Sequence, residues 1–154
     1  MIKIVKGDIL SSGCEAIVNP VNCVGVMGKG LAALVKNAYP LVYLQYRDNC
    51  SRKLVRPGKI LVTPTYNTSG IFPNYIFNFP TKRHWKNKSL IQDIELGLND
   101  LLNCINKYEI SSIAIPSLGC GNGGLDWNVV KPLIINIIKI VADDVNVLVY
   151  EPLN

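Results

Sequence analysis

Short apolar runs and longer amphipathic segments alternate along this 154-residue chain. The apolar runs are rich in valine and isoleucine, which is typical of strands buried in a parallel sheet. The longer segments repeat apolar residues at the three- and four-residue spacing of an α-helix. We therefore predict strands over residues 2–6, 16–21, 59–64, 75–80, 112–116 and 145–150, and helices over 28–38, 41–50, 89–107 and 128–141.

The segment 89–107 carries the clearest helical pattern. Ser89 is a favourable start signal, and apolar residues such as Ile94 and Leu98 then recur on one face. Strands that alternate with helices predict an α/β domain with helices on both faces of a mixed, mostly parallel sheet. We find no repeat or linker, so we expect a single domain over residues 1–154. Ligands of such folds bind at the carboxyl ends of the strands.

Composition narrows the class of protein. The chain is 49% hydrophobic and 18% charged, which fits a compact globular protein and argues against disorder. No apolar run approaches the roughly 20 residues of a membrane-spanning helix, and the N-terminus is too short and alternating for a signal peptide. Five cysteines without a CxxC pair indicate reduced thiols in the cytoplasm. We expect a monomer.

The charge and the metal-ligating residues add two expectations. The single histidine, His84, argues against a zinc site, so we expect neither a metal nor a cofactor. The formal net charge of +5 favours an anionic partner.

A glycine-rich stretch, Ser-Leu-Gly-Cys-Gly-Asn-Gly-Gly-Leu-Asp-Trp over residues 117–127, links the predicted strand 112–116 to the last helix. Its four glycines exceed what a tight turn needs, and they let the backbone approach a ligand closely. Free N–H groups and a helix N-terminus both favour phosphate, so this loop predicts an anion cradle. Asp126 is its only charged residue. Cys120 lacks a basic partner, so we interpret it as a small packing residue.

Two other predicted strands end in polar loops. Residues 19–30 supply Asn22, an amide that can bond sugar hydroxyls, and three glycines before a helix, without a Walker or GxGxxG pattern. The alternative role for Asn22 is to satisfy local backbone groups. Asp8 follows the first strand, where it either accepts a hydrogen bond from an amino group or caps a turn.

A basic run over residues 81–88 follows the strand 75–80. Lys82 lies nearest the strand-end cleft, and burial and the adjacent Arg83 would both lower the pKa of a nucleophilic lysine there. The rest of the run is either a solvated loop or a patch that follows a nucleic-acid backbone with one stacking aromatic. The second alternative gives four nucleic-acid contacts: Arg83, Trp85, Lys86 and Lys88.

Taken together, these motifs resemble those of macrodomains, the ADP-ribose-binding fold, over essentially the whole chain. The resemblance runs from Gly-Asp-Ile at residues 7–9 through residues 19–30 and 117–124 to Val-Tyr-Glu-Pro at 149–152. Residues 22–30 and 119–127 are similar to the terminal ADP-ribose glycohydrolase branch and to DarG-type antitoxins, which remove ADP-ribose from DNA modified by the toxin DarT. The resemblance implies a three-layer α/β/α macrodomain.

The resemblance also implies a role for each loop. Asp8 would bond the adenine amino group with the Ile9 backbone nearby, and Asn22 would hold the distal ribose. Gly28 and Gly30 would let their loop approach that ribose and the diphosphate. Backbone N–H groups would wrap the diphosphate at Ser117, Gly119, Cys120, Gly121 and Asn122.

The DarG-type branch carries a catalytic lysine at the position of Lys82. Lys82 would either attack the distal anomeric carbon as a neutral amine or, protonated, assist the leaving group. Asp126, where related enzymes pair an aspartate with their lysine, would stabilise the cationic sugar or deprotonate Lys82 or water. Asn22 completes the implied catalytic set.

The expected substrate is ADP-ribosylated DNA, and a cognate ADP-ribosyltransferase toxin is an implied partner. Three alternatives stay open at this point. The domain could remove ADP-ribose from protein glutamate or aspartate esters, act as an ADP-ribose-1''-phosphate phosphatase, or bind ADP-ribose without turnover. The last two have no need of Lys82.

Overall fold

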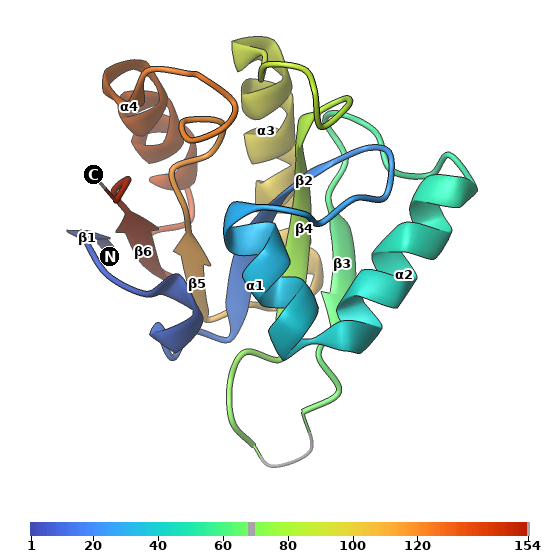
Figure 1. Cartoon of the computed structure of the whole chain (residues 1–154). Helices are drawn as coiled ribbons and strands as arrows, with labels where there is room; N and C mark the ends of the chain where they lie inside the picture. Colours follow the sequence, from blue (N-terminus) through green and yellow to red (C-terminus); the bar gives the residue numbers. More distant parts are fainter. Residues whose placement is uncertain (68–69, 154) are drawn as a thin grey trace.

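The chain forms one six-stranded sheet in a computed structural model that describes residues 1–67 and 70–153 (Figure 1). The strand order is β1-β6-β5-β2-β4-β3, and β3 alone runs antiparallel to its neighbour. The predicted mixed, mostly parallel sheet is therefore confirmed. Its strands are β1 (Ile2–Val5), β2 (Ala16–Asn22), β3 (Leu61–Pro64), β4 (Tyr75–Lys82), β5 (Ser112–Ile115) and β6 (Asn146–Tyr150).

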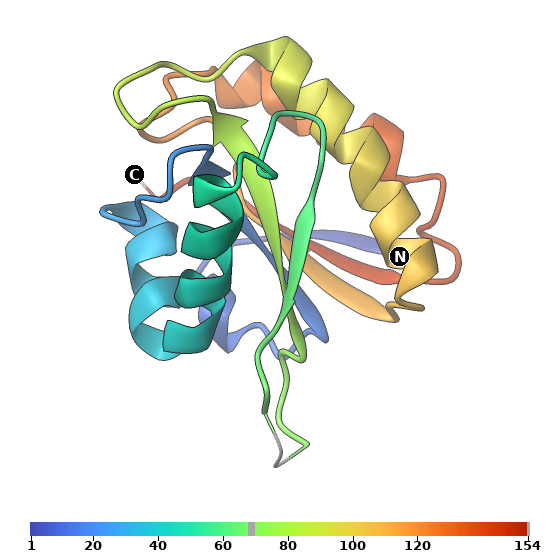
Figure 2. The same ribbon diagram turned by 90° about the vertical axis from the view of Figure 1, so that its right-hand side faces the viewer.

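Helices cover both faces of the sheet, which confirms the predicted three layers (Figure 2). Two pack on one face, α3 (Ile91–Lys107) and α4 (Trp127–Ile138), and two on the other, α1 (Gly30–Ala38) and α2 (Pro40–Ser51). A 3₁₀ turn, η1 (Ile9–Ser11), follows β1. The larger apolar core lies between the sheet and the α3–α4 layer.

Three buried polar side chains fix how the central strands meet. The Asn19 amide donates to Asn78 Oδ1 at 3.2 Å, and the Asn78 amide donates to Thr63 Oγ1 at 3.0 Å. These residues lie on β2, β4 and β3, and all are at most 1% exposed. Because a register slip would leave buried polar groups unpaired, the network favours the observed strand pairing.

Two helices start two residues later than predicted, while α2 and α4 each start one residue earlier. The prediction that Ser89 starts a helix is wrong: α3 begins at Ile91, since the Ser89 N–H donates to the Gly123 carbonyl at 2.9 Å and holds Ser89 in the preceding loop. Helix α1 begins at Gly30 instead of Gly28, because Lys29 is extended. Both differences lengthen loops at the carboxyl edge of the sheet.

Two further features of the chain concern its cysteines and the hydropathy of its helices. The five cysteines lie among the described residues and are free thiols. No helix in the described ranges has the length and hydropathy that crossing a membrane requires.

Candidate active site

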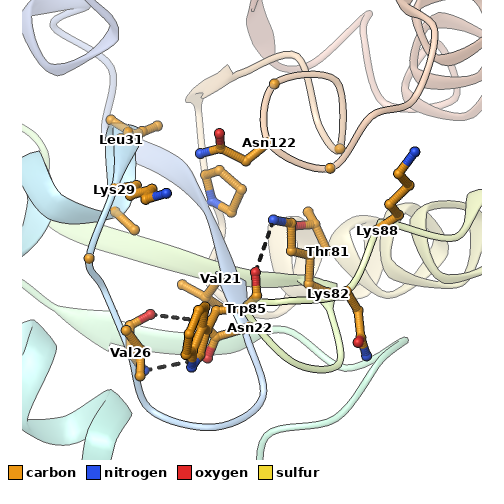
Figure 3. A pocket seen from close by; sticks show the side chains of 18 of the residues that line it. Val21, Asn22, Val26, Lys29, Leu31, Thr81, Lys82, Trp85, Lys88 and Asn122 are labelled. Atoms are coloured by element: carbon orange, nitrogen blue, oxygen red, sulfur yellow. Dashed lines mark hydrogen bonds between the residues drawn. The ribbon is translucent and has the colours of Figure 1, made fainter.

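A cavity of about 680 Å³ opens at the carboxyl ends of β2, β4 and β5 (Figure 3). Its volume lies within the range of small-molecule sites. Three loops form its walls, each following one of these strands, as the sequence predicted. Most of its lining comes from residues 20–32, 81–88 and 116–123.

The cavity has a strongly cationic lining. Four lysines line it, and no aspartate or glutamate does. Lys29 approaches from the loop before α1, Lys82 is the last residue of β4, and Lys86 and Lys88 come from the loop after it. In Figure 3, Lys29 and Lys88 lie on opposite sides of the view. Such a cavity favours an anionic ligand. The four are Lys29, Lys82, Lys86 and Lys88.

Lys82 is placed by an irregularity at the end of β4. Val21 pairs with Pro80, but Asn22 pairs with Lys82, so Thr81 is an extra residue on β4. Bulges of this kind re-aim side chains beside functional sites. Here the bulge brings Asn22 and Lys82 opposite each other, and Lys82 Nζ donates to the Trp85 carbonyl at 3.4 Å (Figure 3).

Asn22 lines the cavity, but its amide also organises the loop that follows β2. Its Oδ1 accepts from the N–H groups of Val24 at 3.0 Å and Val26 at 3.4 Å, and lies 2.8 Å from the Tyr46 hydroxyl. Its Nδ2 donates to the Val26 carbonyl at 2.7 Å. The alternative local role is therefore confirmed. One Nδ2 proton is left, so Asn22 meets a ligand as a donor.

The loop 117–125 is tightly packed on one side and open on the other. Gly119 has φ +74°, and a Cβ there would meet the Leu125 side chain at 2.7 Å. A Cβ on Gly123 would collide with the Ser89 hydroxyl, whereas one on Gly121 would meet nothing within 4 Å. The open side faces the cavity, because Ser117, Gly119, Gly121 and Asn122 all line it.

Cys120 belongs to the packed side of this loop and does not line the cavity. Burial, and secondarily the charge of Asp126, raises the pKa of its thiol to about 11. A thiol with such a pKa is protonated at neutral pH and is a poor nucleophile. The structure therefore agrees with the packing role predicted for Cys120.

Asp126 is the N-cap of α4. Its Oδ1 accepts from the Asn128 N–H at 2.9 Å, a common role for aspartate before a helix. Asp126 does not line the cavity, and no hydrogen bond or ion pair joins it to Lys82 in residues 1–67 and 70–153. The structure thus does not bring the predicted pair together.

Asp8 and Ile9 lie outside the cavity as well. The Asp8 carboxylate caps η1, accepting from the Leu10 N–H at 3.0 Å and the Ser11 hydroxyl at 2.9 Å. The predicted alternative of a turn or cap is therefore confirmed, and the adenine contact stays a prediction.

The basic loop divides into two parts. Arg83 makes a double contact at 3.2 Å with Asp93, a carboxylate with only 4% of its side chain exposed, and this contact raises the pKa of Arg83. Its charge is thus paired and it does not line the cavity. Trp85, Lys86 and Lys88 do line it. The indole is 49% exposed, with Lys86 Nζ 5.1 Å from its ring centroid.

Several lining residues were missed in the sequence. Lys29 stands between Gly28 and Gly30, and this position at a helix start was the available signal. Val26, Thr81 and Asn87 lie in strand-end loops that the sequence marked, but their apolar or neutral side chains gave no individual signal, and Pro116 ends the predicted strand before the glycine-rich loop.

The chain belongs to the macro domain family, whose family model, "Macro domain", matches residues 18–134. It is 43% identical over 152 residues to a DNA ADP-ribosyl glycohydrolase of Mycobacterium tuberculosis, covering 99% of this chain and 42% of that protein. A protein of the same name from Thermus aquaticus is 45% identical over 153 residues, which cover 99% of this chain and 41% of the relative. The chain thus spans about two fifths of these relatives.

Solved structures agree. The macrodomain of Mycobacterium tuberculosis DarG superposes with a TM-score of 0.96 at 42% identity, covering 99% of both chains. Thermosipho africanus DarTG in complex with ADP-ribose superposes with a TM-score of 0.91 at 38% identity, covering 99% of this chain and 42% of that one. The fold and the DarG-type resemblance are therefore shown.

Proposed function

We propose that this domain is an ADP-ribosyl glycohydrolase that removes ADP-ribose from modified DNA. The observation that carries the proposal is Lys82, placed by a β-bulge opposite Asn22 in a cavity with a cationic, carboxylate-free lining. The names of the DNA ADP-ribosyl glycohydrolases, and a DarTG structure that holds ADP-ribose, support the choice of ligand and substrate.

The ligand lies across the three loops in this proposal. Its diphosphate lies against the open side of the loop 117–123, where Gly121 leaves space. The remaining Asn22 N–H donates to the distal ribose, with Gly28 and Gly30 alongside. The adenine extends past the cavity toward Asp8 and Ile9, and the backbone of Cys120 contributes to the diphosphate contacts.

Lys82 acts where the distal ribose joins the base. The glycosidic bond breaks, its electron pair leaves with the base, and a water oxygen ends on the anomeric carbon. A protonated Lys82 gives the departing base its proton, whereas a neutral Lys82 forms a covalent sugar adduct that water then hydrolyses. The hydrogen bond to the Trp85 carbonyl uses one N–H of Lys82 Nζ. The other N–H groups, or the lone pair of the neutral amine, stay available for proton transfer or for attack on the sugar.

The role of Asp126 requires a variant of its own. As an N-cap outside the cavity it stabilises α4, and a catalytic role would require it to move. Asp126→Asn removes the charge and keeps an oxygen that caps helices well. We expect thermal stability close to that of wild type, and turnover that falls only if the carboxylate itself takes part.

A substrate panel tests the proposed function. The protein is incubated with an ADP-ribosylated oligonucleotide, with protein carrying ADP-ribosylated glutamate, and with ADP-ribose-1''-phosphate, and free ADP-ribose is quantified. The proposal expects the fastest release from DNA. Fastest release from protein would replace it with protein deADP-ribosylation, fastest release from the phosphate with phosphatase activity, and binding without release with a reader function.

We propose that Trp85, Lys86 and Lys88 contact the DNA strand beside the cleft. Each phosphate contact steepens the salt dependence of binding by about one unit. Lys86→Gln with Lys88→Gln should therefore lower the log–log salt slope for DNA by about two without weakening binding of free ADP-ribose. An unchanged slope would show instead that this loop is a solvated surface without DNA contacts.

Arg83 needs its own variant, since its charge is already paired. We expect Arg83→Gln to leave the salt slope nearly unchanged and to lower the melting temperature, because Asp93 stays buried without its partner. A slope change as large as that of the lysine variant would restore Arg83 as a DNA contact.

A cognate ADP-ribosyltransferase toxin is the proposed partner of the protein that contains this domain. A relative from Thermosipho africanus, 39% identical over 145 residues, is named a fusion of a DNA ADP-ribosyl transferase with a DNA ADP-ribosyl glycohydrolase. Co-expression should rescue cells from the transferase, and Lys82→Ala should abolish the rescue.

A further inference from the structure

Positive charge is concentrated in one part of the chain. Residues 22–60 contain seven lysines and arginines and one acidic residue, Asp48, a net charge of +6. Residues 81–88 contribute +4. The remaining residues, five basic and ten acidic, carry −5, which gives the chain its total of +5. The excess charge therefore belongs to the α1–α2 segment, the loop that follows it and the basic loop.

The loop that ends this segment lies at the end of the sheet where β4 ends (Figure 2), and the last residues of β4 line the cavity. Helix α1 starts at the cavity and runs away from it, and α2 returns toward that edge. Strand β3 is antiparallel to β4, with Leu61 opposite Asn78. The loop 52–60 therefore lies at the carboxyl edge, beside the β4 end that carries Lys82.

A second, smaller groove of about 210 Å³ lies under this loop. Arg56 and Lys59 make no ion pair within the described residues, whereas Arg52 lies 3.7 Å from Asp48. The Asp100 carboxylate lies beside the groove, where it accepts from the Ile60 N–H at 2.7 Å. The groove thus presents two cations. It is lined by Asn49, Leu54, Arg56, Lys59, Ile60 and Leu61.

Sheet geometry gives the separation of the two sites. Leu61 pairs with Asn78, and Lys82 lies four residues further along β4. With a rise of about 3.3 Å per residue and strands about 4.8 Å apart, Leu61 is about 14 Å from Lys82. The groove that Leu61 lines therefore lies within reach of a DNA strand whose modified base sits at Lys82.

We propose that Arg56 and Lys59 form a second phosphodiester site, which holds the DNA strand a few nucleotides from the ADP-ribosylated base. The proposal rests on the proposed function for the identity of the substrate. A DNA backbone fits better than an acidic protein, because the cations continue along the same end of the sheet from the lysines of the cleft to this groove, as a continuous chain of phosphates requires.

The test compares Arg56→Gln/Lys59→Gln with wild type on modified oligonucleotides of different length. One set carries a single nucleotide on each side of the modified base, and the other carries eight. For the long set, we expect the log–log salt slope of binding to fall by about two in the variant. For the short set and for free ADP-ribose, we expect no difference.

Two controls keep the result specific. Lys107→Gln/Lys139→Gln makes the same charge change at the far ends of α3 and α4, and it should leave the slope unchanged. Arg56→Lys/Lys59→Arg keeps both charges and should keep the wild-type slope. Melting temperatures confirm that each variant is folded.

Three outcomes would overturn the groove site: an unchanged slope with long DNA, an equal change with short DNA, or an equal change in the far-end control. Unmodified long DNA separates this proposal from the proposed function. If wild type binds it with a slope that the variant lowers, yet releases no ADP-ribose from modified DNA, the groove stands and the glycohydrolase fails.

Discussion

Gly121 and Gly123 are two residues apart in the same loop but differ in what surrounds them. We expect Gly121→Ala to fold normally, because a Cβ there meets nothing within 4 Å, and to weaken ADP-ribose binding by placing a methyl in the cavity. Gly123→Ala pushes against the Ser89 hydroxyl and should destabilise the fold by about 1–3 kcal/mol. Calorimetric titration with ADP-ribose and thermal melts measure the two effects. Equal stability of both variants would contradict this packing.

Tyr46 connects the α2 layer with the site. Its side chain is fully buried, its hydroxyl lies 2.8 Å from the Asn22 main-chain and side-chain oxygens, and burial raises its pKa. Tyr46→Phe should cost about 1 kcal/mol of stability, since Asn22 Oδ1 keeps its two N–H donors. It should also weaken ADP-ribose binding, because the amide loses one constraint on its orientation.

Tyr108→Phe is the matched control for Tyr46. Tyr108 follows the last turn of α3 and packs against Phe77 and Tyr75, at the opposite end of β4 from Lys82. It should leave ADP-ribose affinity at the wild-type level. Unchanged ADP-ribose affinity in Tyr46→Phe would show that Tyr46 does not orient Asn22 for ligand binding.

At the scale of elements, the contact between α3 and β4 supports the end of the strand that carries Lys82. A Cβ on Gly97 of α3 would collide with the ring of Phe79, which is fully buried on β4. Alanine normally stabilises a helix by about 1 kcal/mol relative to glycine. Here overpacking outweighs that gain, so we expect Gly97→Ala to lower stability by about 1–2 kcal/mol.

A second substitution tests whether the ring of Phe79 causes the loss of stability in Gly97→Ala. Gly97→Ala combined with Phe79→Leu should lose less stability in urea unfolding than the two single changes together, since the smaller side chain makes room for the methyl. Simple additivity would show that the ring and the helix do not meet as described.

The sequence predicts elements better than their ends. The apolar runs placed all six strands, and the pattern is clearest for central strands such as β2 and β5, whose burial on both faces favours valine and isoleucine. The start of α3 was missed, since it depends on the contact between Ser89 and Gly123, residues that only the fold brings together. The same holds for Lys82, which the bulge at Thr81 moves from after β4 into its last position.

Site residues, too, could be predicted where the cause lies in the local sequence, and not where it lies in a contact between distant segments. Asn22 and Lys82 could be predicted because strand ends of an α/β sheet converge. Asp126 and Arg83 looked like site residues because their charges are visible in the sequence, whereas their helix cap and buried ion-pair partner are not. Lys29 was overlooked, although it lines the opposite wall.

For the whole molecule, three partly or fully buried thiols predict how stability depends on pH. Burial raises the pKa of Cys23, Cys104 and Cys120 from 9.0 to about 11. Below pH 9 these thiols are protonated in both states. As the pH rises from 9 to 11 they ionise in the unfolded chain first, so the free energy of unfolding should fall.

Urea unfolding at pH 8 and pH 10 measures this effect. The triple change of these cysteines to alanine should lose less stability between the two pH values than wild type. An equal loss in the two proteins would contradict burial of the thiols.

The central claim is that Lys82 performs chemistry in a cavity that binds ADP-ribose independently of it. The most direct measurement is Lys82→Ala, with Lys131→Ala as a control outside the cavity, assayed for ADP-ribose release from ADP-ribosylated DNA and for ADP-ribose affinity. General acid–base catalysis contributes about 10²–10⁴-fold. We predict a loss of at least that size in turnover, near-wild-type affinity, and an unaffected control. Undiminished turnover in Lys82→Ala would contradict the account.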